Sequence, residues 1–288
     1  MKPWIIAARP RTLPAAIVPV LVGAALATHE GHFSWLRFIA ALLASLLIQI
    51  GTNYVNDVFD FLKGADKNRK GPTRATQSGM VTPRQMFIAI AIVFGLAMLL
   101  GVYLISVGGW PILMIGLASI LAGIAYTAGP FPLAYNGLGD LFAFLFFGVV
   151  AVVGTYYTQT LHFSGLAFGI SIPVACLVTA IIVVNNCRDI ETDRVVNKHT
   201  LAVMMGDILT RYYFAGLIGI AYGVITGLGL QYSLWWLLPW FSAPLAIKLV
   251  IDLWQAKQGM EFNRCLAATA RLHMIFGLLL ALSLIISK

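Results

Sequence analysis

Residues 86–126 read MFIAIAIVFGLAMLLGVYLISVGGWPILMIGLASILAGIAY and contain no charged side chain. A helix needs about 20 mostly apolar residues to cross the hydrocarbon core of a bilayer. The stretch is long enough for two such helices, and residues 106–109 supply a short, uncharged connection between them. We therefore predict two membrane-spanning helices over 86–107 and 110–126.

The same apolar pattern extends over the whole chain. Hydrophobic residues make up 60% of the sequence and charged residues 10%, and the mean hydropathy is +0.88. Because a soluble domain carries about 25% charged residues, this chain lacks the polar surface that water requires. We predict an all-α integral membrane protein, one polytopic domain over 1–288 with about nine transmembrane helices. The predicted spans are 12–28, 38–56, 86–107, 110–126, 138–157, 165–184, 212–230, 233–251 and 266–286.

The basic residues give these helices a direction. Arg9-Pro10-Arg11 interrupts the first apolar run and no small-residue cleavage site follows, so we interpret the first helix as permanent. With the N-terminus in the cytoplasm, every Lys and Arg except Arg37 and Lys288 lies on the inner side. We predict a multi-pass protein of the cell membrane whose N-terminus and inner loops are cytoplasmic. The net charge of +8 then reflects orientation and an anion site, with no nucleic-acid binding.

Three inner loops are predicted to be long, namely 57–85, 127–137 and 185–211. Two clusters of carboxylate and amide side chains lie at the first and the third of these loops. In each cluster, helical spacing brings the oxygen-bearing side chains to one face if the preceding helix continues. The first cluster holds Asn53, Asp57, Asp60 and, further on, Asp66; the second holds Asn185, Asp189 and Asp193. One such loop often only solvates a helix end, but two with the same Asn/Asp spacing on one side favour a shared ligand.

Oxygen ligands without His or Cys indicate a hard cation, and we predict Mg²⁺. An ionised Asp near the bilayer costs up to about 2.5–3.5 kcal/mol on insertion scales, so both clusters need a counter-ion. We predict that the side chains of both clusters bind Mg²⁺. The predicted catalytic residues are Asp57, Asp60, Asp189 and Asp193.

Carboxylates among basic residues suggest a diphosphate that Mg²⁺ bridges to Asp and that Lys or Arg contacts directly. The preferred contacts are Lys63, Arg74, Arg188, Arg194 and Lys198, with Lys67, Arg69 and Lys70 as further candidates. A diphosphate at the mouth of an apolar bundle implies a lipid tail inside it, where exclusion of water protects an allylic cation. Aromatic faces such as Tyr54 and Tyr126 would stabilise that cation, although packing is the commoner role of any one aromatic residue.

The motifs occur in a fixed order along the chain. They are ArgProArgThrLeuPro at 9–14, Asn56-Asp57 through Asp60, Gly64 and Asp66, GlyProThrArgAla at 71–75, Gly137-Leu138-Gly139-Asp140, Asn185-Asn186-x-Arg188-Asp189, Thr192-Asp193-Arg194, and Lys198-x-Thr200-Leu201-Ala202-Val203. This ordered set resembles the UbiA superfamily of intramembrane prenyltransferases. The resemblance implies a nine-span bundle with a central cavity, in which both Asp motifs bind Mg²⁺ and a prenyl diphosphate.

Within the superfamily, the sequence looks most like the enzymes that act on 1,4-dihydroxy-2-naphthoate. That likeness implies Mg²⁺-dependent transfer of a polyprenyl group from its diphosphate to this acceptor, with decarboxylation, giving demethylmenaquinone for menaquinone biosynthesis. The expected partners are these two substrates and the lipid bilayer, and we infer no obligate protein partner. Arg9, Arg11 and Arg74 are the candidates for the acceptor carboxylate, and the sequence does not choose among them.

Departures from the family pattern and alternative functions qualify this interpretation. Asn197 replaces a common Gly, His199 a frequent Arg, and Asn136 an often basic residue. Phytyl transfer to a naphthoate and prenyl transfer to 4-hydroxybenzoate are alternatives within the superfamily. A cation-coupled transporter is the alternative from another class, but the Asp residues lie at predicted helix ends and not at the bilayer midplane.

Overall fold

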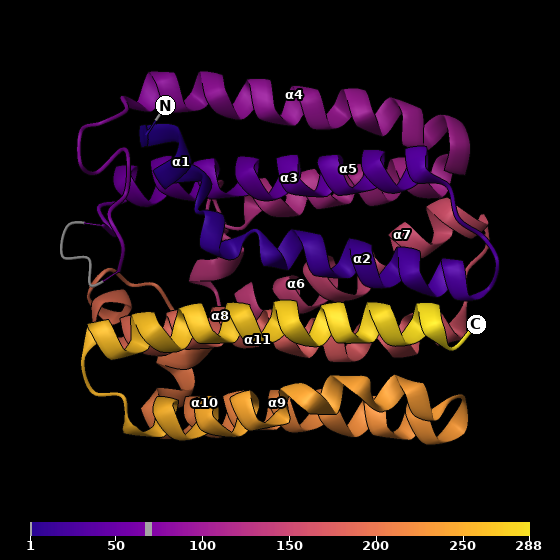
Figure 1. Ribbon diagram of the computed structural model, residues 1–288. Helices are drawn as coiled ribbons and strands as arrows, with labels where there is room; N and C mark the ends of the chain where they lie inside the picture. Colours follow the sequence, from indigo (N-terminus) through magenta and orange to yellow (C-terminus); the bar gives the residue numbers. More distant parts are fainter. Residues whose placement is uncertain (1, 67–70) are drawn as a thin grey trace.

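Long helices that run side by side make up almost the whole computed structural model, which describes residues 2–66 and 71–288 (Figure 1). The elements are α1 (Lys2–Ala8), η1 (Pro10–Thr12), α2 (Pro14–His29), α3 (Trp35–Leu62), α4 (Pro83–Gly108), α5 (Trp110–Ala125), η2 (Leu133–Tyr135), α6 (Gly139–Ala143), η3 (Phe144–Val150), α7 (Ala151–Thr160), α8 (Gly165–Val195), α9 (Leu201–Gln231), η4 (Leu234–Ser242), α10 (Ala243–Gln255) and α11 (Gly259–Ile286). In the described ranges, β structure is limited to one bridge between Asn136 and His199. The all-α prediction is confirmed.

Each of the nine predicted spans corresponds to helix, but the spans are not alike. Seven helical segments in the described part of the chain are long and apolar enough to cross a bilayer alone. The first span is a bent pair, in which Lys2–Thr12 meets Pro14–His29 at 53°. Helix α5 has 16 residues and is about 24 Å long, less than the roughly 30 Å hydrocarbon core. Nine is therefore an approximate count of full spans.

The helices beside the two acidic clusters are longer than predicted. Helix α3 continues to Leu62 and α8 to Val195, while α9 already begins at Leu201. The inner connections are therefore 63–82 and 196–200, in place of 57–85 and 185–211. An apolar run marks only the part of a helix that contacts lipid. These helices continue as polar segments because other segments of the same chain hold their polar side chains.

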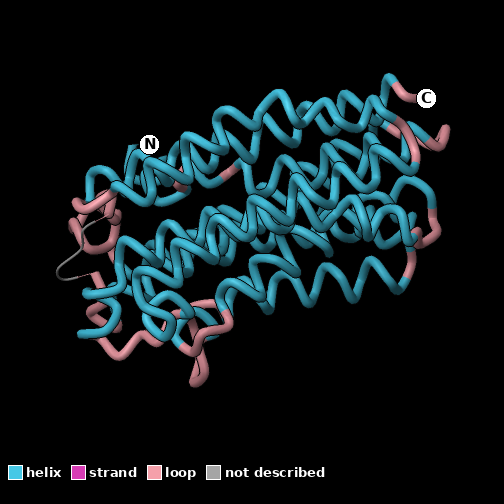
Figure 2. The backbone as a smooth tube through the Cα atoms, turned by 90° about the horizontal axis from the view of Figure 1, so that it is seen from below, coloured by secondary structure: helices cyan, strands magenta, loops and turns pink. Residues whose placement is uncertain are grey.

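One end of the bundle collects the N-terminus and all the inner connections. Figure 1 shows the start of α1 and the loops after α3, α8 and α10 at the left end, with the C-terminus at the right. Figure 2 shows the same helices from below, nearly parallel, with most of the loops toward the two ends. Both acidic clusters therefore lie at one end of the molecule, as the topology predicted.

Close helix contacts and one irregular turn shape the interior. A Cβ added at Gly148 would lie 2.1 Å from the Ala175 Cβ, so glycine lets η3 touch α8. The segment Phe144–Val150 is a π-helical turn between α6 and α7, a feature that is rare and frequent at functional sites. It widens the helix where Phe146 and Phe147 face a cavity.

Candidate active site

Asp60, near the end of α3, is the centre of the first acidic cluster. Its carboxylate accepts hydrogen bonds from Arg74 Nη2 at 3.1 Å and from the Tyr135 hydroxyl at 2.9 Å. Arg74 Nε also lies 3.5 Å from Asp66 Oδ2. Asp60, Asp66 and Arg74 are all buried, so one guanidinium compensates two carboxylates that have left bulk water.

Asp57 lies one turn earlier on α3 and is 1% exposed. Its carboxylate accepts the backbone N–H groups of Ala75 at 3.1 Å and Thr76 at 2.8 Å. Charge-assisted bonds of this kind are stronger than neutral ones. Asp57 therefore holds the loop that carries Arg74 against α3, while Asp60 meets the arginine itself.

Amide side chains of α3 hold two further segments at the same end. Asn53 Nδ2 donates to the Ala8 carbonyl at 2.9 Å and to Thr12 Oγ1 at 3.1 Å. Asn56 Oδ1 accepts a bond of 2.7 Å from Thr127 Oγ1. The first cluster thus joins the N-terminal segment, the loop after α3 and the loop after α5.

Arg188 organises the second cluster on α8. Its Nε and Nη2 atoms donate to the two oxygens of Asp189 at 2.8 and 2.6 Å, a bidentate pair. Nη2 also donates to Asn185 Oδ1 at 2.9 Å, and Nη1 donates to Asn263 Oδ1 at 2.7 Å. The second motif is therefore connected to α11 through Asn263.

Tyr135, in the loop after α5, is where the two clusters meet. Its hydroxyl bonds to Asp60, and its ring lies below two ammonium groups, Lys63 Nζ at 4.4 Å and Lys198 Nζ at 5.5 Å from the centroid. Lys198 Nζ is also 3.4 Å from Asp193 Oδ1. One aromatic side chain thus contacts Asp60 from α3 and the lysine that pairs with Asp193 from α8.

The charges around Tyr135 shift its own pKa and those of both lysines. Burial, then the carboxylates of Asp60, Asp193 and Asp66, raise the pKa of the phenol well above its ordinary value. Burial lowers the pKa of Lys198, but Asp193 and the other carboxylates outweigh it and the net pKa is raised. Burial lowers the pKa of Lys63 against the opposing effect of Asp60. Tyr135 therefore remains a protonated hydrogen-bond donor.

Asp140 and Tyr126 extend the polar site toward the interior. Asp140, in the first turn of α6, accepts a bond of 3.1 Å from Asn186 Nδ2. The Tyr126 hydroxyl lies beside Gly139, where an added Cβ would be 3.1 Å from it. The Tyr126 hydroxyl therefore faces the start of α6, next to the residue that precedes Asp140.

The three positions that depart from the family pattern lie close together. The Asn136–His199 bridge joins the loop after α5 to the connection after α8, and His199 N donates to the Tyr135 carbonyl at 2.9 Å. Asn197 has φ of 53°, a left-handed conformation that Gly adopts freely and Asn tolerates. The replacement of Gly by Asn therefore preserves the backbone path.

The other predicted residues have different surroundings. Arg194 is exposed. Tyr54 is buried against α1, where its hydroxyl donates to the Trp4 carbonyl at 3.3 Å, and it lines none of the three cavities described below. Lys67, Arg69 and Lys70 lie outside the described residues. The predicted roles of all these residues stay predictions.

Sequence reasoning missed Tyr135 and Asn263. Tyr135 lies in a Pro/Gly-rich loop and contacts Asp60, and Asn263 lies in the last helix and contacts Arg188. In both pairs the two residues are 75 positions apart in the sequence. The only signal for Tyr135 was its place just before the Gly137–Asp140 segment. Asn263 had no signal, because a single amide near a helix end is unremarkable.

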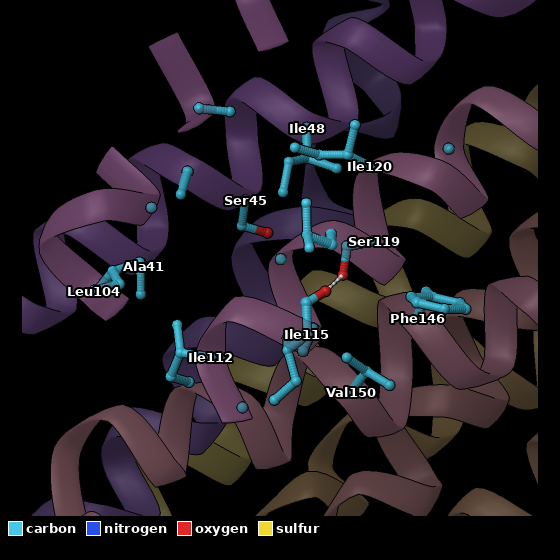
Figure 3. A pocket seen from close by; sticks show the side chains of 18 of the residues that line it. Ala41, Ser45, Ile48, Leu104, Ile112, Ile115, Ser119, Ile120, Phe146 and Val150 are labelled. Atoms are coloured by element: carbon cyan, nitrogen blue, oxygen red, sulfur yellow. Dashed lines mark hydrogen bonds between the residues drawn. The ribbon is translucent and has the colours of Figure 1, made fainter. Parts of the chain in front are cut away.

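An apolar cavity of about 340 Å³ begins beside this polar site (Figure 3). Tyr126 and Thr52 border it at the end near the acidic clusters, and Ile112 and Thr158 border it at the other end. Aliphatic and aromatic side chains of α3, α4, α5, η3 and α7 make up most of its wall. A mostly apolar cavity with a few polar groups at one end is typical of a small-molecule site.

Two further cavities lie between the N-terminal segment and α11. The second cavity, about 380 Å³, is bordered by Arg9, Arg11, Arg74, Asn185 and Asn263 among others. The third, about 670 Å³, shares Arg11 and Asn263 with the second and adds Arg264 and Arg271. All three sequence candidates for an acceptor carboxylate therefore border one cavity.

The donor atoms of the two clusters fit Mg²⁺ shared with a phosphate group. They are carboxylate and amide oxygens, the ligands of a hard cation. Asp193 Oδ2 is buried without a hydrogen-bond partner among the described residues. In the same residues, no group of three or more His, Cys, Asp or Glu is arranged to hold a metal by itself. Mg²⁺ commonly uses one or two carboxylates plus substrate phosphates, so this donor set is sufficient.

Comparison with known proteins gives consistent matches. The model of the UbiA prenyltransferase family matches residues 16–283. The 1,4-dihydroxy-2-naphthoate octaprenyltransferase of Mycobacterium tuberculosis (strain ATCC 25618 / H37Rv) is 35% identical over 278 residues, covering 96% of this chain and 95% of the relative. The enzyme of the same name from Escherichia coli (strain K12) is 35% identical over 297 residues, covering 99% of this chain and 96% of the relative.

Two solved structures share the fold at low sequence identity. The apo structure of a UbiA homologue from Aeropyrum pernix K1 has a TM-score of 0.75 and 14% identity, covering 93% of this chain and 97% of that one. A UbiA homologue from Archaeoglobus fulgidus bound to DMAPP and Mg²⁺ has a TM-score of 0.65 and 12% identity, covering 96% and 99%.

Proposed function

The chain belongs to the UbiA prenyltransferase family and is an enzyme that transfers prenyl groups; from this premise we propose that its donor is a polyprenyl diphosphate and its acceptor 1,4-dihydroxy-2-naphthoate. The acceptor loses its carboxylate, and the product is the quinol form of demethylmenaquinone, an intermediate of menaquinone biosynthesis. The structural observation that carries the proposal is the apolar cavity that begins at Tyr126, beside the two acidic clusters. The relatives named for this acceptor support the choice of naphthoate.

The polar end of the site is suited to a diphosphate. We assign the Mg²⁺ ligands to the Asp residues of both clusters, with Asp60 and Asp193 nearest to Tyr135. When bound there, Mg²⁺ would neutralise charge on the diphosphate and on the departing pyrophosphate. Lys63 and Lys198 present their ammonium groups on the ring of Tyr135 and are positioned as direct phosphate contacts.

The interior is suited to the prenyl group. The bond between the first tail carbon and the diphosphate oxygen breaks, and its electron pair leaves with pyrophosphate. The apolar wall excludes water, which would otherwise capture the allylic cation. The neutral Tyr126 ring at the mouth of the cavity stabilises positive charge by its face.

The second cavity is suited to the aromatic acceptor. Arg9 and Arg11 border this cavity from the N-terminal segment, and we assign the acceptor carboxylate to them. The ring carbon that bears the carboxylate forms the new bond to the tail. The carbon–carbon bond to the carboxylate then breaks, carbon dioxide leaves, and the electron pair returns to the ring. This sequence needs no strong base, in keeping with two clusters that contain no histidine.

The chain is a multi-pass membrane protein. We propose that its polar end faces the cytoplasm, because basic residues crowd that end. Family membership makes the chain an enzyme and not a cation-coupled transporter. Phytyl transfer and prenyl transfer to 4-hydroxybenzoate are the alternatives. An assay with several donors and several acceptors distinguishes them from the proposed reaction.

The direct test supplies purified protein with Mg²⁺, a polyprenyl diphosphate and dihydroxynaphthoate. We expect release of pyrophosphate and carbon dioxide in equal amounts, with a prenylated naphthol as product. Asp57→Ala and Asp189→Ala should abolish turnover while circular dichroism still reports a helical protein. Absence of product with every donor length, or product only with 4-hydroxybenzoate, contradicts the proposal.

A further inference from the structure

Three arginines surround the third cavity, in the groove between η1 and α11. Arg11 comes from η1, and Arg264 and Arg271 come from α11. All three are exposed, and in the described part of the chain no ion pair joins any of them to a carboxylate. The described residues that line the cavity include neither Asp nor Glu. Positive charge gathered without a protein counter-ion is suited to an anionic ligand.

The acidic residue of α11 has another partner. The carboxylate of Glu261 accepts the backbone N–H groups of Lys257 at 2.6 Å and Gln258 at 3.0 Å, and so closes the start of the helix. Arg264 Nη2 instead lies 3.8 Å from the sulfur of Met260, which is a weak acceptor. The guanidinium of Arg264 therefore keeps its donors for a ligand.

Arg271 lies too deep in the bilayer to be an ordinary surface anchor. Helix α11 runs from Gly259 at the polar end of the bundle to Ile286 at the other end, beside the C-terminus (Figure 1). Arg271 is 15 positions before Ile286, about 22 Å, and Arg264 is 22 positions before it, about 33 Å. Since the hydrocarbon core is about 30 Å thick, Arg264 lies at the level of the lipid headgroups. Arg271 lies within the hydrocarbon, where an ionised side chain needs an anion or water within reach.

The direction of α11 brings Arg271 toward the headgroups. Side chains of an α-helix point toward its N-terminus, which in α11 is the polar end. Long arginine side chains extend in this way to the membrane interface. Arg264 is seven positions earlier, almost two full turns, and so lies on the same face of the helix. The two guanidinium groups therefore follow one another along one face, at and just below the headgroup level.

The same face of α11 is apolar farther from the polar end. Leu278 and Ile285 follow Arg271 at intervals of seven positions, and both are exposed. The 14 positions from Arg271 to Ile285 correspond to about 21 Å, more than the roughly 15 Å thickness of one leaflet of the core. Pro14 and Met274 add apolar surface at the cavity itself. One charged end and a long aliphatic continuation match the two parts of a phospholipid.

We propose that the groove between η1 and α11 binds an anionic phospholipid from the leaflet at the polar end. Its phosphate diester contacts Arg271 and Arg264, and an acyl chain lies along Leu278 and Ile285. Basic pockets between membrane helices bind such headgroups in other proteins. The inference goes beyond the proposed function and does not depend on it. Because Arg11 borders both this cavity and the second one, the lipid headgroup lies next to the site assigned to the acceptor.

Membrane orientation alone does not account for this arrangement. The positive-inside rule places basic residues in loops and at helix ends. Arg84 is such a residue, since it is exposed at the start of α4 and lines none of the three cavities. Arg271 instead lies 12 positions inside α11 and borders a cavity together with two other arginines. Arg84 is therefore a matched control for the proposed site.

The experiment compares two lipids that differ only in their headgroups. Purified protein in detergent receives equal amounts of phosphatidylglycerol and phosphatidylcholine with identical acyl chains, and native mass spectrometry measures the ratio of the two lipids bound. One basic residue near the membrane surface changes the binding of an anionic lipid about fivefold. We expect the wild-type protein to favour phosphatidylglycerol, and the ratio to fall about fivefold in Arg264→Gln and in Arg271→Gln. Arg271→Lys, which keeps the charge, and Arg84→Gln should both retain the preference.

Several outcomes overturn the proposal. One is equal binding of both lipids to the wild-type protein, and another is a fall in Arg84→Gln as large as that in Arg271→Gln. Displacement of the lipid by an equal concentration of glycerophosphoglycerol, which has the headgroup without acyl chains, would identify a site for free phosphate diesters. An unchanged lipid ratio in Arg271→Gln with a raised KM for dihydroxynaphthoate would assign the groove to the acceptor. No prenyl donor enters the binding measurement, so a protein without transferase activity would overturn the proposed function and leave the lipid site standing.

Thermal unfolding in nanodiscs gives a second readout. A ligand that binds only the folded protein raises the Tm. The wild-type Tm should therefore be higher in nanodiscs that contain phosphatidylglycerol than in nanodiscs of phosphatidylcholine alone. The difference should shrink in the double variant Arg264→Gln/Arg271→Gln and persist in Arg84→Gln. An equal difference in the wild type and the double variant contradicts the proposal.

Discussion

Replacing Tyr135 by Phe should slow prenyl transfer while leaving the helical bundle intact. The substitution removes the hydroxyl that donates to Asp60 at 2.9 Å and keeps the ring on which Lys63 and Lys198 rest. A hydrogen bond to a charged group contributes about 1.5–3 kcal/mol. Since 1.4 kcal/mol corresponds to a factor of ten, we expect kcat/KM to fall roughly 10- to 150-fold.

The assay follows pyrophosphate release as the Mg²⁺ concentration is varied. Because Asp60 loses one of the two groups that orient it, the Mg²⁺ concentration for half-maximal rate should rise in Tyr135→Phe, which a merely structural role would not cause. Tyr157→Phe is the matched control: it removes a hydroxyl that donates to the Gly108 carbonyl at 3.2 Å, at the other end of the bundle. Thermal unfolding in detergent measures the stability of both variants.

Two results would refute this reasoning. The first is a Tyr135→Phe enzyme with wild-type kcat/KM and wild-type Mg²⁺ dependence, which would mean that Asp60 does not need the hydroxyl. The second is an equal loss of rate in Tyr157→Phe, which would assign the effect to general destabilisation. Either result removes Tyr135 as the residue that joins the two clusters.

Three further perturbations test other parts of the structure. Asp193→Asn replaces the carboxylate whose Oδ2 is buried without a partner, and the Mg²⁺ concentration for half-maximal rate should rise at least about tenfold; an unchanged titration would exclude Asp193 as a ligand. Arg211→Met removes donors to the Leu253 and Ala256 carbonyls at the end of α10, which should cost about 1–3 kcal/mol of stability and lower the Tm with little change in kcat/KM. Treatment with EDTA should stop turnover, Mg²⁺ should restore it, and the far-UV circular dichroism should stay constant throughout.

Local sequence predicted the helices well and their polar ends less well. Apolar runs located all nine segments, because each run reports the lipid that surrounds it. The same method ended α3 and α8 too early, since Asp57, Asp60 and Asp193 are polar yet lie within continuous helices. Asp57 is held by two backbone amides about 18 positions away in sequence, and no local pattern reports such partners.

The sequence by itself determined that this is an all-helical membrane protein with both acidic clusters at one end. Hydrophobicity and charge are properties of neighbouring residues, so span positions and the side of each loop follow from short windows. Only the tertiary structure decided how the clusters meet, with Tyr135 between Asp60 and Lys198. It also decided that residues of α3, α4, α5, η3 and α7 together line one apolar cavity beside the polar site. Those features depend on packing between helices that are distant in sequence. There, the role of a side chain depends on the residue that it contacts and not on its own type alone.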